Sequence, residues 1–196
     1  MSASPDPDPE PEPRPEPVGP AAPGPQIVPD SKDWTWVLHE RCPECGFLAA
    51  DVDPFDIGPT IRELAPRWVA ALHRLDARER PAPTVWSVLE YGAHVRDVHR
   101  VFGERLHLML TEDDPVFANW DQDATAVADR YDLQEPVVVA DELVDAADAL
   151  ADRYDAVAPA AWSRPGRRSN GSPFTVQTLG QYFLHDVVHH LHDVHA

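Results

Sequence analysis

Four long stretches of the chain place apolar side chains three and four residues apart, the spacing that gathers them on one face of an α-helix. They cover residues 57–75, 87–110, 136–157 and 175–194. The first stretch has a predicted buried face made of Ile61, Leu64, Trp68, Leu72 and Leu75. Because strand-like alternation is nearly absent, these patterns predict an all-α, four-helix bundle, a fold that builds its sites from inward side chains on facing helices.

Several residues mark the ends and weak points of these helices. Ser87 is followed three residues later by Glu90, a capping-box pattern that predicts the start of the second helix. Pro59 and Pro136 suit a first helical turn, where no backbone donor is needed. Pro66 lies inside the first pattern, so a kink or break is expected there.

The N-terminal part of the chain has a different composition. Residues 1–30 alternate proline with acidic residues and have almost no bulky apolar side chains, which predicts a disordered, extended tail. Residues 31–55 are aromatic-rich and too short to form a domain, so we expect an extended arm that lies over the main body. Residues 56–196 then form the helical domain.

Charge and composition exclude several functions. The net charge is -18 and the pI is about 4.7, whereas binding of nucleic acid needs clustered Lys and Arg. The sequence has no apolar run long enough for a membrane span and no basic segment followed by an apolar core at its N-terminus. Two cysteines do not make a disulfide framework. We therefore expect a cytoplasmic monomer or homodimer that binds neither nucleic acid nor membrane.

Histidines on two predicted helices point to a metal. His185 and His189 lie four residues apart, so both imidazoles share one helix face, and His192 extends the row. His94 lies within an apolar stripe of the second helix, where an unpartnered polar side chain is costly to bury. We predict that His94, His185 and His189 hold one divalent ion with an open coordination position, which is typical of a reactive metal. The alternatives are a His-rich, partly exposed C-terminus and a satisfied core histidine at His94.

Two segments around these histidines resemble the DinB superfamily. The segment WSVLEYGAHVRDVHRVF looks like the metal-binding second helix of that superfamily, with His94 as the ligand. The segment FTVQTLGQYFLHDVVHHLHDV looks like its last helix, with an H-x-x-x-H pair. The resemblance covers residues 57–194 and implies a DinB-like bundle. Relatives include mycothiol-dependent maleylpyruvate isomerases and thiol transferases that use bacillithiol or mycothiol, and some of these isomerases have a Glu in the place that His185 would occupy.

Other polar residues have more than one interpretation. Cys42 and Cys45 form a C-x-x-C pair, which indicates a second metal site, a redox pair or two inert thiols. His39, His192 and His195 are the histidines that we consider as further ligands of a Cys/His site.

Acidic and basic side chains near the last helix also have two interpretations. Asp186 and Asp193 either accept hydrogen bonds from ligand imidazoles or only solvate the last helix. Arg167 and Arg168 lie in the segment RPGRRSNGSPF, predicted as a loop or short hairpin, and either bind a substrate anion or are solvated charges.

The resemblance implies a thiol-dependent activity. Zinc is the expected ion, with nickel and iron as alternatives, and mycothiol is the implied thiol co-substrate. A metal-bound thiol loses its proton and can attack a small electrophile, so we expect an S-transferase or an isomerase. The competing interpretations are a non-catalytic, metal-binding or stress-associated protein and a metal-dependent hydrolase.

Overall fold

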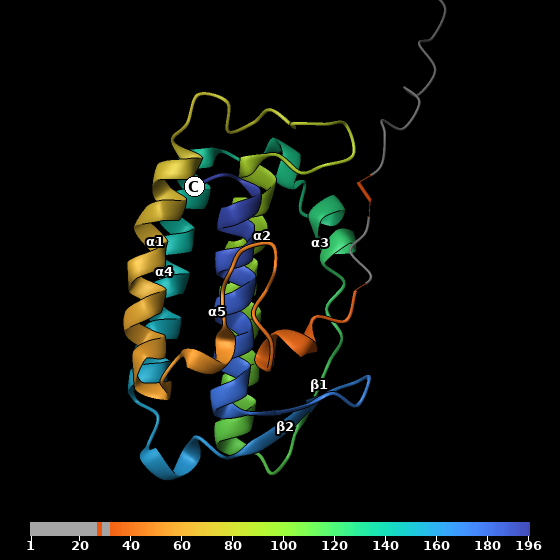
Figure 1. The fold of residues 1–196 in the computed structure, drawn as a ribbon. Coiled ribbons are helices and arrows are strands. Elements are labelled where there is room, and N and C mark those ends of the chain that lie inside the picture. Colours follow the sequence, from red (N-terminus) through yellow and green to blue (C-terminus); the bar gives the residue numbers. More distant parts are fainter. Residues whose placement is uncertain (1–26, 29–31) are drawn as a thin grey trace, which may run out of the picture.

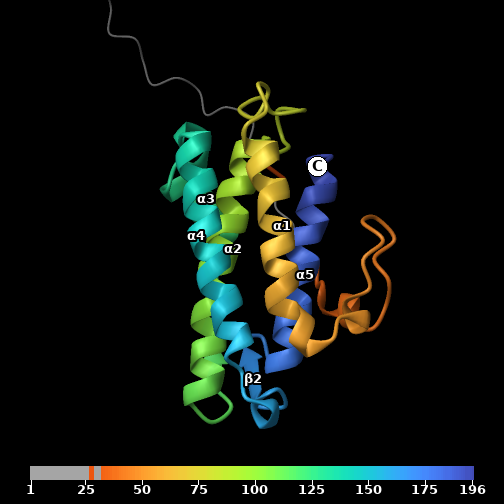
Figure 2. The ribbon, with the colours of Figure 1, turned by 90° about the vertical axis from the view of Figure 1, so that its left-hand side faces the viewer.

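Four long helices form a bundle in the computed structural model, which describes residues 27–28 and 32–196 (Figure 1). They are α1 (Ile57–Leu72), α2 (Val88–Thr111), α4 (Pro136–Asp155) and α5 (Val176–Asp193). Both α1 and α2 pack against α4 and α5, and the helices run side by side in two perpendicular views (Figure 2). The predicted four-helix bundle is confirmed. The tail predicted for residues 1–30 lies outside the described residues, except for Ile27 and Val28.

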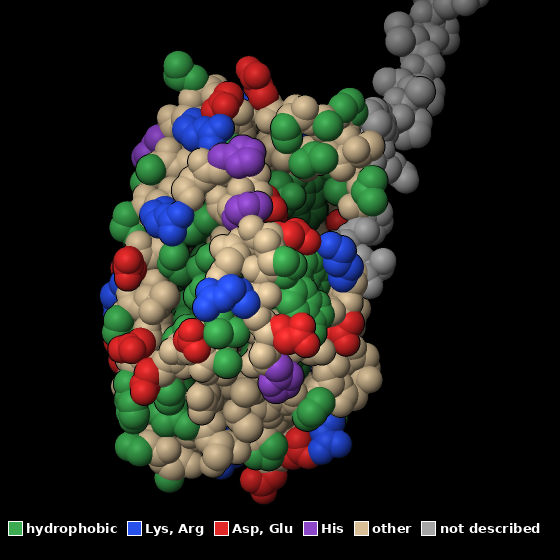
Figure 3. Space-filling view, in the orientation of Figure 1, with side chains coloured by type: hydrophobic (Ala, Val, Ile, Leu, Met, Phe, Trp, Pro, Cys, Tyr) green, Lys and Arg blue, Asp and Glu red, His purple; other side chains and the backbone are tan. Residues whose placement is uncertain are grey.

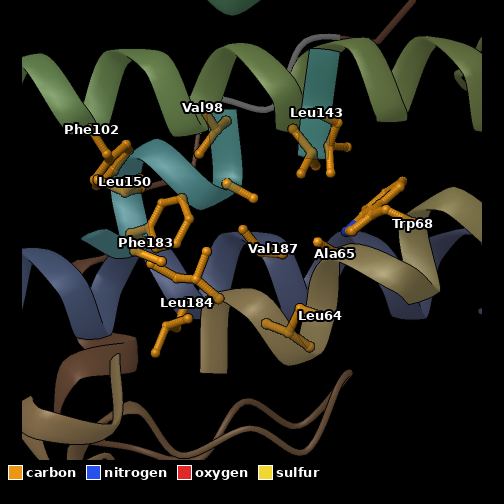
Figure 4. Packing of buried hydrophobic residues seen from close by; sticks show 14 of the residues in the cluster. Leu64, Ala65, Trp68, Val98, Phe102, Leu143, Leu150, Phe183, Leu184 and Val187 are labelled. Atoms are coloured by element: carbon orange, nitrogen blue, oxygen red, sulfur yellow. The ribbon is translucent and has the colours of Figure 1, made fainter. Parts of the chain in front are cut away.

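The apolar stripes of the four helices meet in one core (Figure 4). Trp68 of α1, Leu143 of α4 and Phe183 of α5 are fully buried. Phe183 packs at a ring-centroid distance of 5.5 Å from Phe102 of α2. Leu75 is an exception to the predicted buried face, because α1 ends at Leu72 and the side chain of Leu75 is fully exposed.

The helix ends follow local sequence signals. The Ser87–Glu90 capping box at the start of α2 is present, as predicted. A second capping box, formed by Thr175 and Thr178, begins α5 and was not predicted. The predicted kink or break at Pro66 is not a break, because α1 continues through this residue as one helix. The kink stays a prediction. Packing on α4 and α5 stabilises the turn that loses a hydrogen bond there.

Shorter elements surround the bundle. A seven-residue helix, α3 (Gln122–Ala128), follows α2. The strands β1 (Val116–Phe117), β2 (Pro165–Arg168) and β3 (Pro173–Thr175) form a small sheet in which β2 is parallel to β1 and antiparallel to β3. The loop or hairpin expected before the last helix is therefore the β2–β3 hairpin. The 3-10 helices are η1 (Thr35–Leu38), η2 (Ala49–Asp51), η3 (Pro54–Asp56), η4 (Tyr131–Leu133) and η5 (Pro159–Ala161).

The segment before α1 packs along α5. Its 3-10 helices η1 and η2 both contact α5. Val37 and Ala49 are fully buried and anchor this segment on the bundle. It places Cys42 and Cys45 beside the C-terminal half of α5, as the next section describes. None of the helices in the described part of the chain is long and apolar enough to cross a membrane.

Candidate metal centres

The last helix carries two interleaved pairs of ligand-type side chains. His185 and His189 form one pair, and Asp186 and His190 form the other, each with a spacing of four residues. The two pairs are one residue apart, which is a rotation of about 100° around the helix axis. α5 therefore presents two pairs of potential metal ligands on adjacent faces.

One pair joins a histidine of α2. The ligand atoms of His94, Asp186 and His190 all lie within 4.8 Å of one another. The Oδ1 atom of Asp186 is 3.6 Å from Nε2 of His94 and 3.8 Å from Nε2 of His190. We call these three residues the α2–α5 centre.

The α2–α5 centre contains buried polar atoms that the described residues leave without a hydrogen bond. His94 is fully buried, and neither of its ring nitrogens has a hydrogen-bond partner. The Oδ1 atom of Asp186 also has none. Buried polar atoms in folded proteins are normally satisfied, because each unpaired one costs free energy. A cation bonded to these atoms would satisfy them, so the donor set fits a metal ion.

Neighbouring side chains hold these ligands in place. The Oδ2 atom of Asp193 lies 2.8 Å from Nδ1 of His190, which leaves Nε2 of that ring on the side of Asp186. The indole of Trp120 stacks on His94 at a centroid distance of 5.4 Å and an interplanar angle of 7°. Trp86 lies against the same imidazole, also at 5.4 Å. Carboxylate partners and packing of this kind fix the tautomer and orientation of metal ligands.

The electrostatics of the α2–α5 centre favour the protonation states that metal ligands need. Burial lowers the pKa of His94, so this imidazole is neutral near pH 7. Burial alone would raise the pKa of Asp186, but the neighbouring His94 and His190 outweigh it and lower that pKa to about 2. A neutral imidazole and an ionised carboxylate are the forms that bind a metal.

The second pair on α5 faces the N-terminal arm. The ligand atoms of Cys42, Cys45, His185 and His189 all lie within 4.8 Å of one another. The Sγ atom of Cys42 is 3.6 Å from Nδ1 of His189. Burial raises the pKa of Cys45 to about 11, which keeps its thiol protonated and unreactive in the absence of a metal. We call these four residues the arm–α5 cluster.

This arrangement differs from the expected ligand set. The structure places His94 with Asp186 and His190, and it places His185 and His189 with the cysteines. The reason is the helical rotation between adjacent residues, because only the face that carries Asp186 and His190 turns toward α2.

The histidines considered as further ligands of the cysteines also lie outside this group. His39, His192 and His195 are exposed, and none belongs to the arm–α5 cluster. Its histidines are instead a buried pair, 4% exposed at His185 and 7% exposed at His189.

The sequence reasoning missed two ligand candidates. His190 is not among the predicted ligands, and Asp186 is predicted only as a hydrogen-bond acceptor or a solvated side chain. A signal was present, because Asp186 and His190 also have the spacing of four residues that puts two ligands on one face.

A cavity of about 600 Å³ opens beside the α2–α5 centre. From α5, both Asp186 and His190 and the neighbouring His185 and His189 line it. The indoles of Trp34, Trp86 and Trp120 form much of its aromatic wall. Figure 3 shows histidine side chains gathered over the upper half of α5, next to a hollow with hydrophobic side chains. The volume is in the range of sites for small molecules.

The two arginines of the β2–β3 hairpin have different positions. Arg167 is exposed and forms an ion pair with Asp114. Arg168 lines the cavity, and its guanidinium forms no hydrogen bond or ion pair with a described residue. Adjacent residues of a strand point to opposite sides, which explains the difference. Only Arg168 is therefore placed to meet a ligand in the cavity.

Comparison with known proteins agrees with this fold. The family model of the DinB superfamily matches residues 60–194. A solved structure of YfiT from Bacillus subtilis, described as a probable metal-dependent hydrolase with an unusual four-helix bundle topology, is similar with a TM-score of 0.65. The two chains are 17% identical, and the match covers 71% of this chain and 82% of YfiT. No curated protein matches the chain. Since the family model spans most of the helical domain, this chain belongs to the DinB superfamily.

Proposed function

We propose that this protein is a metal-dependent enzyme whose reactive divalent ion is held by His94, Asp186 and His190. The observation that carries the proposal is the fully buried imidazole of His94, with two unpartnered nitrogens, next to an ionised carboxylate. A purely structural role for His94 would leave these atoms unsatisfied in the core. The cavity gives small molecules access to Asp186 and His190.

The donor set suits zinc or a neighbouring divalent metal. Two imidazoles and one carboxylate are a known ligand set of catalytic zinc, and three protein ligands leave a position open. An ion bound there would supply Lewis acidity and lower the pKa of a thiol or water at the open position. Asp193 would keep His190 oriented through the hydrogen bond to Nδ1.

For the nucleophile we favour a low-molecular-weight thiol of the mycothiol type. The resemblance to thiol-dependent isomerases and transferases supports this choice. The reaction would be S-transfer to a small electrophile or isomerisation of that electrophile through a thiol adduct.

The cavity residues would bind and orient the substrate. The guanidinium of Arg168 would form a bidentate pair with a carboxylate of the thiol or the electrophile. Trp34 and Trp120 would cover apolar parts of the substrate and exclude water from the reacting atoms.

A hydrolase is the second candidate. Its support is the similarity to YfiT, a protein described as a probable metal-dependent hydrolase. The same three ligands would bind water at the open position in place of a thiol. A third candidate, a non-catalytic metal-binding protein, uses the same ligands without turnover.

The test is conjugation or isomerisation of model electrophiles with mycothiol, bacillithiol and glutathione, with and without a chelator. We expect turnover that depends on one of these thiols and is lost with the chelator and in His190→Ala. The matched control is His192→Ala, because His192 is an exposed histidine on the same helix. Thiol-independent, chelator-sensitive cleavage of a model ester or amide would favour the hydrolase. Absence of any metal-dependent turnover would contradict an enzymatic role.

A further inference from the structure

The arm–α5 cluster is separate from the proposed reactive centre, and its four side chains come from two distant parts of the sequence. Cys42 and Cys45 lie in the arm before α1, whereas His185 and His189 lie on the last helix. We propose that these four residues bind a second zinc ion, which fastens the arm to α5 and is structural. This centre would be present in addition to the α2–α5 centre.

The number and type of ligands support a closed zinc site. Two sulfur and two imidazole ligands are the Cys₂His₂ set, which in proteins holds zinc in tetrahedral geometry. Four protein ligands leave no position for a substrate, whereas the α2–α5 centre offers three. The two centres on α5 therefore differ in the way that structural and catalytic zinc sites differ.

The turn that carries the cysteines has the shape needed to present both sulfurs together. The backbone N–H of Gly46 donates to the carbonyl of Cys42 at 2.9 Å, and the N–H of Cys42 donates to the carbonyl of Phe47 at 2.9 Å. Gly46 has φ of +75°, a conformation that glycine adopts without strain. These bonds close the C-x-x-C loop upon itself, with both sulfurs near the same pair of imidazoles.

The two histidines are placed as ligands rather than as solvated side chains. His189 turns Nδ1 toward the sulfur of Cys42, and its Nε2 lies 3.5 Å from Oε2 of Glu44 and 3.8 Å from Oδ1 of Asp193. Carboxylates at the far nitrogen are the usual partners of a metal-bound imidazole. His185 is 4% exposed, and its Nε2 has no hydrogen-bond partner among the described residues.

The charge balance also suits this location. Binding one zinc ion would release one proton from each thiol to solvent, so two thiolates would neutralise the two positive charges of the ion. A neutral complex can be buried without an uncompensated charge.

A redox pair fits the cluster less well. Such a pair needs an accessible thiol with a lowered pKa, whereas Cys42 is fully buried.

The second ion would influence the cavity through the arm. The ring of Trp34 lies 4.8 Å from that of His189 and 5.5 Å from that of His185, measured between centroids. Lys32, Asp33 and Trp34 all line the cavity next to the α2–α5 centre. Zinc bound by the arm–α5 cluster would therefore hold one wall of the cavity in place.

The first experiment measures metal content of the full chain after purification with zinc and removal of loosely bound ions. We expect two equivalents in the wild type and one in a Cys42→Ser, Cys45→Ser double variant. His190→Ala should also retain one, since it affects only the α2–α5 centre. His39→Ala and His192→Ala are matched controls, because both histidines are exposed and lie near the cluster in sequence, and both variants should retain two. Unchanged metal content in the double variant would overturn the proposal.

Cobalt substitution separates the two centres by their ligands. Sulfur-to-cobalt charge transfer gives strong near-ultraviolet absorption, which we expect in the wild type and in His190→Ala but not in the cysteine double variant. If no metal-dependent turnover is found while this absorption persists, the proposed function is contradicted and the arm–α5 site is not. If the wild type lacks the absorption at full cobalt loading, the arm–α5 site does not exist.

A third measurement uses only the wild type, so it does not depend on the folding of a variant. An organic mercurial that forms bonds to sulfur should release one zinc ion for two thiols modified, with a colorimetric chelator to detect the ion. The second zinc ion should remain bound. Modification of both thiols without release of zinc would contradict the site.

Discussion

Removing the carboxylate of Asp193 should weaken metal binding at the α2–α5 centre. Asp193 holds His190 through a 2.8 Å hydrogen bond to Nδ1. Burial would raise the pKa of Asp193, but this hydrogen bond and the charge of His190 lower it, so the carboxylate is ionised at pH 7. Loss of such a partner typically reduces metal affinity about 10- to 100-fold. In Asp193→Ala we therefore expect a loss of about 1.4–2.8 kcal/mol of binding free energy.

The assay is a competition titration of zinc against a chromogenic chelator, performed in the Cys42→Ser, Cys45→Ser background so that one site is observed. The zinc affinity of Asp193→Asn should lie between those of the wild type and Asp193→Ala, because an amide oxygen can accept the hydrogen bond but carries no charge. The control is Asp141→Ala, which removes an exposed carboxylate from α4. Affinity unchanged in Asp193→Ala would refute the reasoning that Asp193 orients a metal ligand.

Three further predictions concern the bundle and the cavity. The hydroxyl of Tyr131 donates a buried 2.6 Å hydrogen bond to Asp97, so Tyr131→Phe should lower the free energy of unfolding by about 1.5–3 kcal/mol in urea titrations, and no change would contradict this role. Burial would raise the pKa of Asp97, but hydrogen bonds from Arg96 and Tyr131 lower it. The contribution of Asp97 to stability is therefore complete above the ordinary carboxyl pKa of about 3.9 and is lost as pH falls through the lowered pKa. In Asp97→Asn the melting temperature should therefore fall less steeply at acid pH than in the wild type. For an anionic substrate, Arg168→Ala should raise KM about tenfold or more while Arg167→Ala should not, and equal effects would remove the assignment of Arg168.

Much of the bundle could be predicted because its signals are local. The capping box at Ser87 and the apolar stripe through Trp68 act within one or two helical turns, and both are present in the structure. Pro66 and Leu75 show where local signals fail. Tertiary packing holds α1 together at Pro66, and the end of the helix at Leu72 leaves Leu75 in solvent.

The site could be predicted only in part, because the sequence of α5 contains two equivalent patterns. Both His185/His189 and Asp186/His190 have the correct spacing, and no local rule decides which pair faces α2. That choice depends on the rotation of α5 in the bundle, which is set by burial of residues such as Phe183 and Val187. The partnership of the cysteines with His185 and His189 joins residues far apart in sequence, so spacing could not reveal it.

The central claim is that His94, Asp186 and His190 hold the reactive metal. Anomalous diffraction at the zinc absorption edge, from crystals of the zinc-loaded protein, tests it most directly. We predict an anomalous peak within bonding distance of Nε2 of His190, a ring nitrogen of His94 and a carboxylate oxygen of Asp186. A fully loaded protein with no peak among these three side chains would contradict the account.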